Sequence, residues 1–205
     1  VTLAANGADT MQASVSSGAF SDIAGAPIAG IVETVGAFVF GFNISGTPNG
    51  WQCAAVNGYT NWSVSANIQS ASGSLTSTPG PILAGRKFGV QVVAYKKNSM
   101  YLGTYVGAPV VWQFDQIPGN VGALSQEVVV NVGTPENPKH IFMGEDNFYL
   151  YDGSRPVPIG NNRVNQTVFG QMLQSRYYAC TALHDRKNFR VYFYYPVQTQ
   201  PSRIN

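Results

Sequence analysis

The sequence predicts an all-β protein built from β-propeller-like blades of short antiparallel strands, as a partial or open propeller with one short helix. Three observations lead to this prediction. The composition is 44% hydrophobic but only 11% charged, with 22 Gly, a profile that favours strands joined by many turns. Short apolar runs alternate with turns rich in Gly, Pro and Asn along most of the chain. Similar units recur at intervals typical of propeller blades, about 40–50 residues.

The chain divides into three parts by composition. Residues 1–26 are rich in Ala, Ser and Gly and are expected to form an extended N-terminal segment, residues 27–197 the propeller-like domain, and residues 198–205 a polar C-terminal tail. In the first half of the domain, clusters of apolar, aromatic and β-branched residues predict strands at 28–35, 37–42, 51–56, 89–95, 100–106 and 110–114. The intervening turns are predicted from Gly, Pro and Asn at 46–50, 57–62, 96–99, 107–109 and 115–120.

The second half of the domain continues the pattern. Strands are predicted at 127–132, 141–143, 148–151, 177–183 and 189–195. Asp152-Gly153 is a strong chain-reversal signal, and Pro156 and Pro158 keep the following segment out of a central strand. Residues 163–175 carry apolar side chains at helical spacing and predict the one helix, at Val164, Val168, Met172 and Leu173.

An internal repeat supports the blade prediction. Asn98, Asn147 and Asn188 each lie in a turn that leads into an aromatic strand, at separations of 49 and 41 residues, and a looser copy lies at 38–56. A blade cannot bury both of its faces alone and therefore packs on its neighbours. A β-sandwich with regular hairpins would give similar strand spacing, so a sandwich-type binding module remains an alternative.

Charge and cysteine content bound the function. All twelve Lys and Arg residues lie from Arg86 onward, and the formal net charge is only +2, too small to indicate nucleic-acid binding by itself. Cys53 and Cys180 are predicted to be buried free thiols. With only His140 and His184 and no CxxC, no zinc site can be assembled. No apolar run is long enough to cross a membrane, and no signal peptide is visible.

Candidate catalytic and binding residues have simple structural explanations. Propeller glycosidases use paired carboxylates, but Glu145-Asp146 and Asp152 are explained by their turns. Basic pairs at 86–87, 96–97 and 186–187 suit either weak phosphate contacts or solvated hairpin tips. Aromatic residues that suit either a sugar-binding platform or core packing are Trp51, Trp62, Trp112 and those at 192–195. Neither enzymatic activity nor a cofactor is predicted.

Three segments together resemble a known family. These are NGYTNWSVS (57–65), VVAYKKNSMYLGTYVGAPVVWQFDQI (92–117) and IFMGEDNFYLYDGSRPVPIGNNRVNQTVF (141–169). In this order they resemble the β-propeller tail proteins of tailed bacteriophages, described as tail hub, nozzle or DNA-stabilisation proteins. An Asp-Pro of the family's first motif is absent here, with Tyr59-Thr60 near its place. The residues that match the blade motifs are Trp62, Gly107, Pro109, Asp152, Gly153, Pro158 and Gly160.

The resemblance implies a mechanical function. Such proteins are virion components, made in the host cytoplasm, that form rings below the portal and adaptor, line the DNA channel and help retain or eject the genome. The implied partners are copies of the same chain, other tail, adaptor or portal proteins, and passing double-stranded DNA bound without sequence specificity; no membrane is involved. Lys96 and Lys97 are the candidate DNA-channel contacts. The alternative function is a carbohydrate-binding or glycoside-cleaving propeller.

Overall fold

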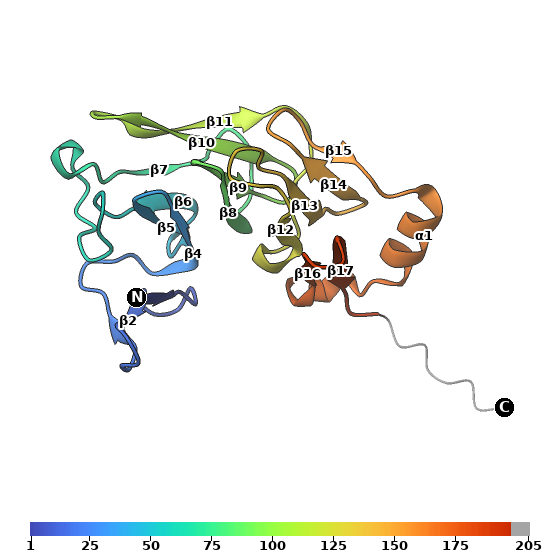
Figure 1. The fold of residues 1–205 in the computed structure, drawn as a ribbon, viewed down its shortest axis with the longest axis horizontal. Coiled ribbons are helices and arrows are strands. Elements are labelled where there is room, and N and C mark those ends of the chain that lie inside the picture. The colour runs from blue at the N-terminus through green and yellow to red at the C-terminus, as the bar shows by residue number, and fades with distance from the viewer. Residues whose placement is uncertain (198–205) are drawn as a thin grey trace.

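The chain forms five antiparallel sheets that follow one another in sequence order, described by a computed structural model for residues 1–197. The predicted all-β fold is confirmed (Figure 1). The predicted tail 198–205 lies outside the described residues. The strands are β1 (Thr2–Ala4), β2 (Gln12–Ser14), β3 (Ser21–Asp22), β4 (Ala29–Val35), β5 (Phe38–Ile44), β6 (Thr47–Cys53), β7 (Ser72–Ser74), β8 (Ala84–Phe88), β9 (Gln91–Tyr95), β10 (Met100–Gly107), β11 (Val111–Ile117), β12 (Val129–Asn131), β13 (His140–Met143), β14 (Phe148–Tyr151), β15 (Val157–Pro158), β16 (Thr181–Asp185) and β17 (Arg190–Tyr194).

Three of the sheets are four-stranded meanders with the topology of propeller blades. They consist of β4–β7, β8–β11 and β12–β15, and in each the first strand forms one edge. These first strands lie against one another, β4 against β8, β8 against β12, and β12 against β16 of the last, two-stranded sheet. Figure 1 shows β11 and β15 on the outer rim of the resulting arc. Sheets that converge on their first strands are blades around an axis, not the two facing sheets of a sandwich.

The arc is open within the described residues. The three-stranded sheet β1–β3 lies at one end and β16–β17 at the other (Figure 1), and no strand pairing joins them in residues 1–197. Residues 1–26, expected to be an extended segment, are therefore ordered in a small sheet of their own. Met11, Ala13 and Ile23 of this part pack on Val39 and Trp62, which makes the N-terminal sheet a further layer on the first blade.

Aromatic side chains hold the first two blades together. Phe40 of β5 contacts Trp112 edge-on with ring centroids 4.8 Å apart, and Trp51 lies 4.7 Å from Phe114. Edge-to-face and tilted pairs at these distances are favourable arrangements of aromatic rings. A Cβ on Gly85 of β8 would lie 2.5 Å from the Phe42 ring, so the two sheets approach as closely as a glycine permits.

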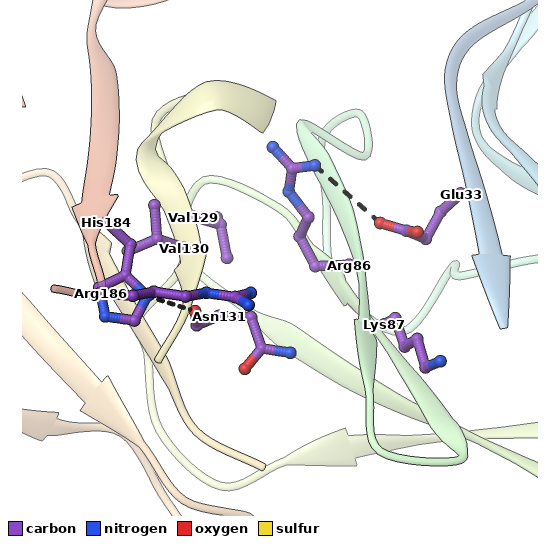
Figure 2. Close-up of a pocket in the computed structure, with 8 residues that line it drawn as sticks. All are labelled: Glu33, Arg86, Lys87, Val129, Val130, Asn131, His184 and Arg186. Atoms are coloured by element: carbon purple, nitrogen blue, oxygen red, sulfur yellow. Dashed lines mark hydrogen bonds and ion pairs between the residues drawn. The ribbon is translucent and has the colours of Figure 1, made fainter. Parts of the chain in front are cut away.

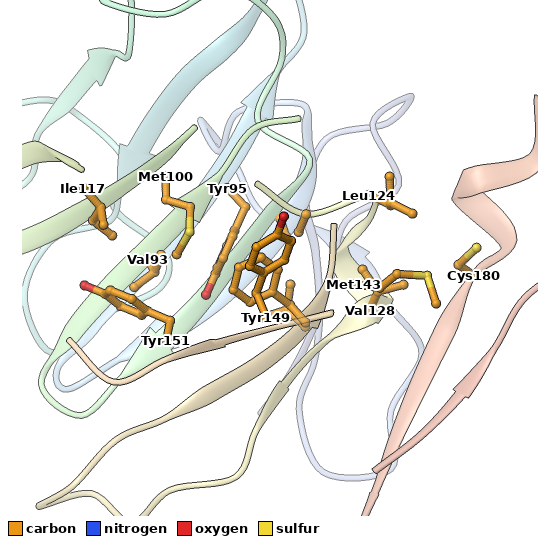
Figure 3. Packing of buried hydrophobic residues seen from close by; sticks show 14 of the residues in the cluster. Val93, Tyr95, Met100, Ile117, Leu124, Val128, Met143, Tyr149, Tyr151 and Cys180 are labelled. Carbon is orange, nitrogen blue, oxygen red and sulfur yellow. The ribbon is translucent and has the colours of Figure 1, made fainter. Parts of the chain in front are cut away.

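A second cluster joins the next two blades and the last sheet (Figure 3). Tyr95 of β9 packs on Phe142 of β13 with centroids 5.2 Å apart, and Phe148 of β14 packs on Phe193 of β17 at 4.8 Å. The cluster continues to Cys180, so one apolar core spans three successive sheets. Stacking of neighbouring sheets, rather than any single sheet, buries the apolar surface.

The one α-helix of residues 1–197, α1 (Asn162–Gln171), confirms the predicted helix and ends four residues earlier than expected. The side chain of Asn161 caps its N-terminus by accepting from the Val164 N–H at 2.9 Å, as Asn favours. Phe169 packs on Phe148 of β14, which fixes the helix against the outer part of the third blade.

Several predicted boundaries were wrong. Residues 177–183 were predicted as a strand, but Gln174–Ala179 forms 3₁₀ turns and β16 begins at Thr181, because local bonds such as Cys180 N–H to Tyr177 O outweigh the β-preference of the tyrosines. Residues 126–128 likewise form a 3₁₀ turn before β12. The turn predicted at 46–50 lies at 45–46, and Pro48 is inside β6.

The copies of the repeat do not all lie at the same place within their sheets, which the sequence did not show. Asn98 and Asn147 both lie in the turn between the second and third strands of a blade, and the looser copy at 38–56 spans the same pair of strands. Asn188, in contrast, lies between the first and second strands, β16 and β17. The first three copies are structurally equivalent, and the fourth is displaced by one strand.

Candidate functional site: the axial pocket

A pocket of about 390 Å³ lies where the first strands of the blades converge, and we call it the axial pocket. Figure 2 shows Glu33, Arg86 and Lys87 on one side of it, and Asn131, His184 and Arg186 on the other. Val129 and Val130 complete the lining. The pocket therefore takes one residue from β4, two from β8, three from β12 and two from β16 and the turn that follows it.

Arg86 is the most strongly held cation of the pocket. Its Nη2 donates to the Gln126 carbonyl at 2.9 Å and lies 3.8 Å from a Glu127 carboxylate oxygen, while Nη1 lies 4.0 Å from Glu33. The Gln126 amide bonds both backbone groups of Gly85, at 2.8 and 3.0 Å, and so covers the free edge of β8. The buried Nε of Arg86 donates to no atom of residues 1–197, so the guanidinium is not saturated.

Glu33 supplies the one carboxylate among the lining residues. Burial raises the pKa of this carboxyl above its ordinary value, and the nearby positive charge of Arg86 opposes the shift. At 4.0 Å the Glu33–Arg86 pair is loose. Glu33 thus offsets part of the positive charge of the pocket without closing it.

The remaining polar residues leave positive charge available. Lys87 and Arg186 form no ion pair with any residue of the described chain, and both are exposed. His184 Nδ1 lies 3.0 Å from the Asn131 carbonyl. Since a carbonyl only accepts, Nδ1 carries the proton in this bond. Three cations and one carboxylate therefore line the pocket.

Lys96, one of the two candidate DNA-channel contacts, binds backbone carbonyls and does not line the axial pocket. It is buried, and its ammonium group donates to the carbonyls of Leu75 at 2.5 Å and Thr78 at 2.6 Å. Burial lowers the pKa of Lys96. Lys97 is exposed, but its Nζ lies 2.8 Å from Glu145, on a hairpin that contributes nothing to the axial pocket. The basic residues that meet at the axis are instead Arg86, Lys87 and Arg186.

One of the basic pairs that suited a hairpin tip lies elsewhere in the structure. Arg86 and Lys87 lie inside β8, not in a turn, because the side chain of Gln126 and the neighbouring β4 provide polar partners along this inner edge. Arg186 and Lys187 do lie in a turn, between β16 and β17.

Each candidate catalytic acid is already engaged by a neighbouring residue. Glu145 pairs with Lys97, and Asp146 accepts from the Tyr149 hydroxyl at 2.7 Å. Asp152, at the opposite end of β14, accepts from the backbone and hydroxyl of Ser154, and these bonds lower the pKa of Asp152. None of the three acids lines the axial pocket. Glu145 and Asp146 line a separate pocket of about 200 Å³, where Lys97 and the Tyr149 hydroxyl already engage their carboxylates, and Asp152 does not line it.

Two of the blade-motif positions shape hairpins and one fills a core. Trp62 is buried between the N-terminal sheet and the first blade, and its Nε1 donates to the Tyr59 carbonyl at 2.8 Å. Gly107 has φ of +77° in the hairpin between β10 and β11, followed by the cis peptide Ala108-Pro109. These positions lie away from the axial pocket.

The remaining residues of the blade motifs shape the edge of the third blade. Gly153 has φ of +106° and lies against the Phe88 ring, and Asp152 closes the same turn. Pro158 lies in the edge strand β15, where a missing N–H costs no central ladder bond. A Cβ on Gly160 would collide with Asn147 and Asn165, so only glycine fits between these amides.

The cysteines and His140 are buried inside the blades. Burial raises the pKa of the Cys53 thiol to about 11 and raises that of Cys180, and both thiols are free, as predicted. His140 accepts from the Tyr95 hydroxyl at 2.6 Å, and its other ring nitrogen lies 2.9 Å from the Lys87 carbonyl. Within residues 1–197 no group of three His, Cys, Asp or Glu side chains could hold a metal ion.

Sequence reasoning missed the axial pocket as a site. The available signal was the order of the blades, because first strands of successive blades meet at an axis. The order of the blades indicates the pocket only when β8 is recognised as a strand. The charged residues Arg86 and Lys87 interrupt the apolar pattern of β8, so the pattern does not predict a strand there.

Comparisons with known proteins add no family. No protein-family model matches the chain, and no curated protein sequence matches it. Among the described helices, none is long and apolar enough to span a membrane. The site and the fold described above, together with the sequence resemblance, are therefore the basis for a functional proposal.

Proposed function

We propose that the chain is a structural component of a bacteriophage tail, in the hub or nozzle ring below the portal and adaptor. It acts there as part of an oligomeric ring that surrounds the DNA path and helps retain or eject the genome. The proposal is supported by the three motifs in family order and by their positions on blade strands and on the turns and loops between them. The observation that carries it is an apolar face at one end of the arc that no residue of 1–197 covers.

The sheet of β16 and β17 has one covered and one uncovered face. On the covered face, Phe193 packs on Phe148 of the third blade. On the other face, Leu183 is paired with Tyr192, and these side chains are 55% and 39% exposed, while the adjacent Tyr194 is 57% exposed. Every preceding blade packs on a neighbour at both faces. An apolar face of this kind is typical of an interaction surface.

The opposite end of the arc supplies a complementary surface. The N-terminal sheet exposes Val15 and Phe20 and carries the acid Asp22, and residues 1–85 contain neither Lys nor Arg. The β16–β17 end carries Arg186, Lys187 and Arg190. We therefore assign the uncovered face to the N-terminal sheet of a second copy. Such a head-to-tail contact closes into a ring when the rotation between copies permits.

The test is a charge placed on the uncovered face. The double variant Leu183→Asp/Tyr194→Asp should shift the purified protein to monomers in sedimentation velocity, because buried carboxylates at an apolar interface are unfavourable. Val90→Asp is the matched control, since Val90 is 81% exposed in the turn between β8 and β9, remote from this face. Circular dichroism verifies that both variants fold. A wild-type monomer at tens of micromolar, or equal effects of both variants, would contradict the proposal.

The carbohydrate-cleaving alternative finds less support in the geometry. A glycosidase places two carboxyl groups about 5–10 Å apart across one sugar, whereas the axial pocket is lined by Glu33 alone among the acids. Trp51, Trp62 and Trp112 are buried in the core. Among the aromatic residues predicted to suit a sugar platform, Tyr192 and Tyr194 are exposed, and they lie on the face assigned above to a second copy.

A further inference from the structure

The axial pocket gathers cations from segments about 100 residues apart, which the fold of four successive sheets brings together. Arg86 and Lys87 come from β8, and Arg186 from the turn after β16. Like charges that line one pocket repel one another unless a charge of opposite sign lies between them. Two carboxylates oppose these cations, and both lie beside Arg86: Glu33, in the lining, at 4.0 Å, and Glu127, outside the lining, at 3.8 Å. Lys87 and Arg186 form no ion pair within residues 1–197.

We propose that the axial pocket binds a small phosphate-bearing anion. Three cations and one carboxylate give the lining a formal charge of +2, or +1 when Glu127 beside Arg86 is included, and a phosphate monoester of opposite sign carries about −1.5 to −2 at neutral pH. Guanidinium groups match phosphate oxygens through paired N–H donors. Arg186 forms no ion pair within residues 1–197 and can make such a contact, and Asn131 lines the same side of the pocket (Figure 2).

The dimensions favour a small molecule over nucleic acid. A volume of about 390 Å³ falls within the range of small-ligand sites, about 300–1,000 Å³. A DNA duplex is far wider than a pocket formed between four strand edges. Val129 and Val130 add apolar surface that suits the body of an organic phosphate. This site goes beyond the proposed tail function and does not depend on it.

Isothermal titration of the purified chain tests the site, with inorganic phosphate, glycerol phosphate and a short DNA duplex at constant ionic strength. Wild-type protein should bind the two small phosphates with saturable heat. Arg186→Gln should weaken binding about tenfold, because one charge-assisted hydrogen bond is lost. Lys87→Gln should act in the same direction. Glu33→Gln should strengthen binding, because the opposing carboxylate is removed from the pocket.

Lys187→Gln is the matched control, since Lys187 is adjacent to Arg186 in sequence and does not line the pocket. It should leave the phosphate affinity unchanged while removing the same net charge. Absence of binding by the wild-type protein at millimolar phosphate would overturn the proposal. It would also be overturned by an equal loss in Lys187→Gln and Arg186→Gln, or by binding of the duplex without binding of either small phosphate.

Discussion

His140 shows how a single buried side chain ties two blades together. It lies at the start of β13 in the third blade and bonds Tyr95 and the Lys87 carbonyl of the second. The carbonyl accepts from Nε2–H, which leaves Nδ1 to accept from the Tyr95 hydroxyl. Burial lowers the pKa of His140 to about 4; the bond to the Lys87 carbonyl opposes this shift and the charge of Arg86 adds to it. The imidazole is therefore neutral in the folded protein at neutral pH.

This pKa predicts a pH dependence of stability. The folded-state pKa of about 4 lies below the ordinary histidine pKa of 6.5, so the unfolded chain takes up a proton first as the pH falls. The contribution of neutral His140 to the free energy of unfolding is about 3 kcal/mol. It is complete above pH 6.5 and is lost as the pH falls from 6.5 to 4. Urea unfolding at pH 7, 5.5 and 4.5 measures it. His140→Gln should remove this part of the slope; an unchanged slope would contradict the assignment.

Lys96 and Lys97 are adjacent in sequence but differ in their environments. Lys96→Met should lower the free energy of unfolding by about 1–3 kcal/mol, because the carbonyls of Leu75 and Thr78 lose their donor inside the protein. Lys97→Met should cost under about 1 kcal/mol, since its pair with Glu145 is exposed to solvent. Urea unfolding of both variants compares them directly. Equal losses of unfolding free energy would contradict the structural role of Lys96.

At the scale of the element, the approach of β8 to β5 sets the spacing of the first two blades. Gly85→Ala should destabilise the protein by about 1–3 kcal/mol, because the added methyl meets the Phe42 ring and forces a shift in a packed core. Gly170→Ala is the matched control, since the space around Gly170 in α1 is open. It should stabilise the protein by up to about 1 kcal/mol through helix propensity. Thermal unfolding of both variants gives the two signs, and a neutral Gly85→Ala would contradict the close packing.

The elements that could be predicted are those whose own residues determine them. The strands β5, β9 and β14 have continuous apolar or aromatic runs, and α1 has both its apolar spacing and Asn161 as a cap. The strand β8 could not be recognised, because Gln126 and Glu33, distant in sequence, satisfy its polar groups. For the same reason the axial pocket was missed, since it exists only where four separate strands converge.

The burial of Lys96 could not be predicted from its local sequence. A KKNS turn between two strands is normally solvated, and the sequence offers no sign that the Leu75–Thr78 segment passes over Lys96 and accepts its hydrogen bonds. The blade-motif glycines, in contrast, could be understood from local geometry, because Gly107 and Gly153 occupy positive φ in tight turns.

At the scale of the whole molecule, the chain is an arc of blades with two dissimilar ends. One end is neutral to acidic and the other basic, and both expose apolar side chains. The low charged fraction of 11% suits a protein whose surface is largely covered by partners. These properties favour head-to-tail assembly. The proposed phosphate site lies on the axis of the arc and shares Arg186 with the basic end.

Ring formation by the purified chain tests the central proposal most directly. Negative-stain electron microscopy over a range of protein concentrations should show closed rings built from successive arcs, which increase in number with concentration. The Leu183→Asp/Tyr194→Asp variant should show single arcs under the same conditions. Single arcs of the wild-type protein at every concentration would contradict the assignment of this chain to a ring of the phage tail.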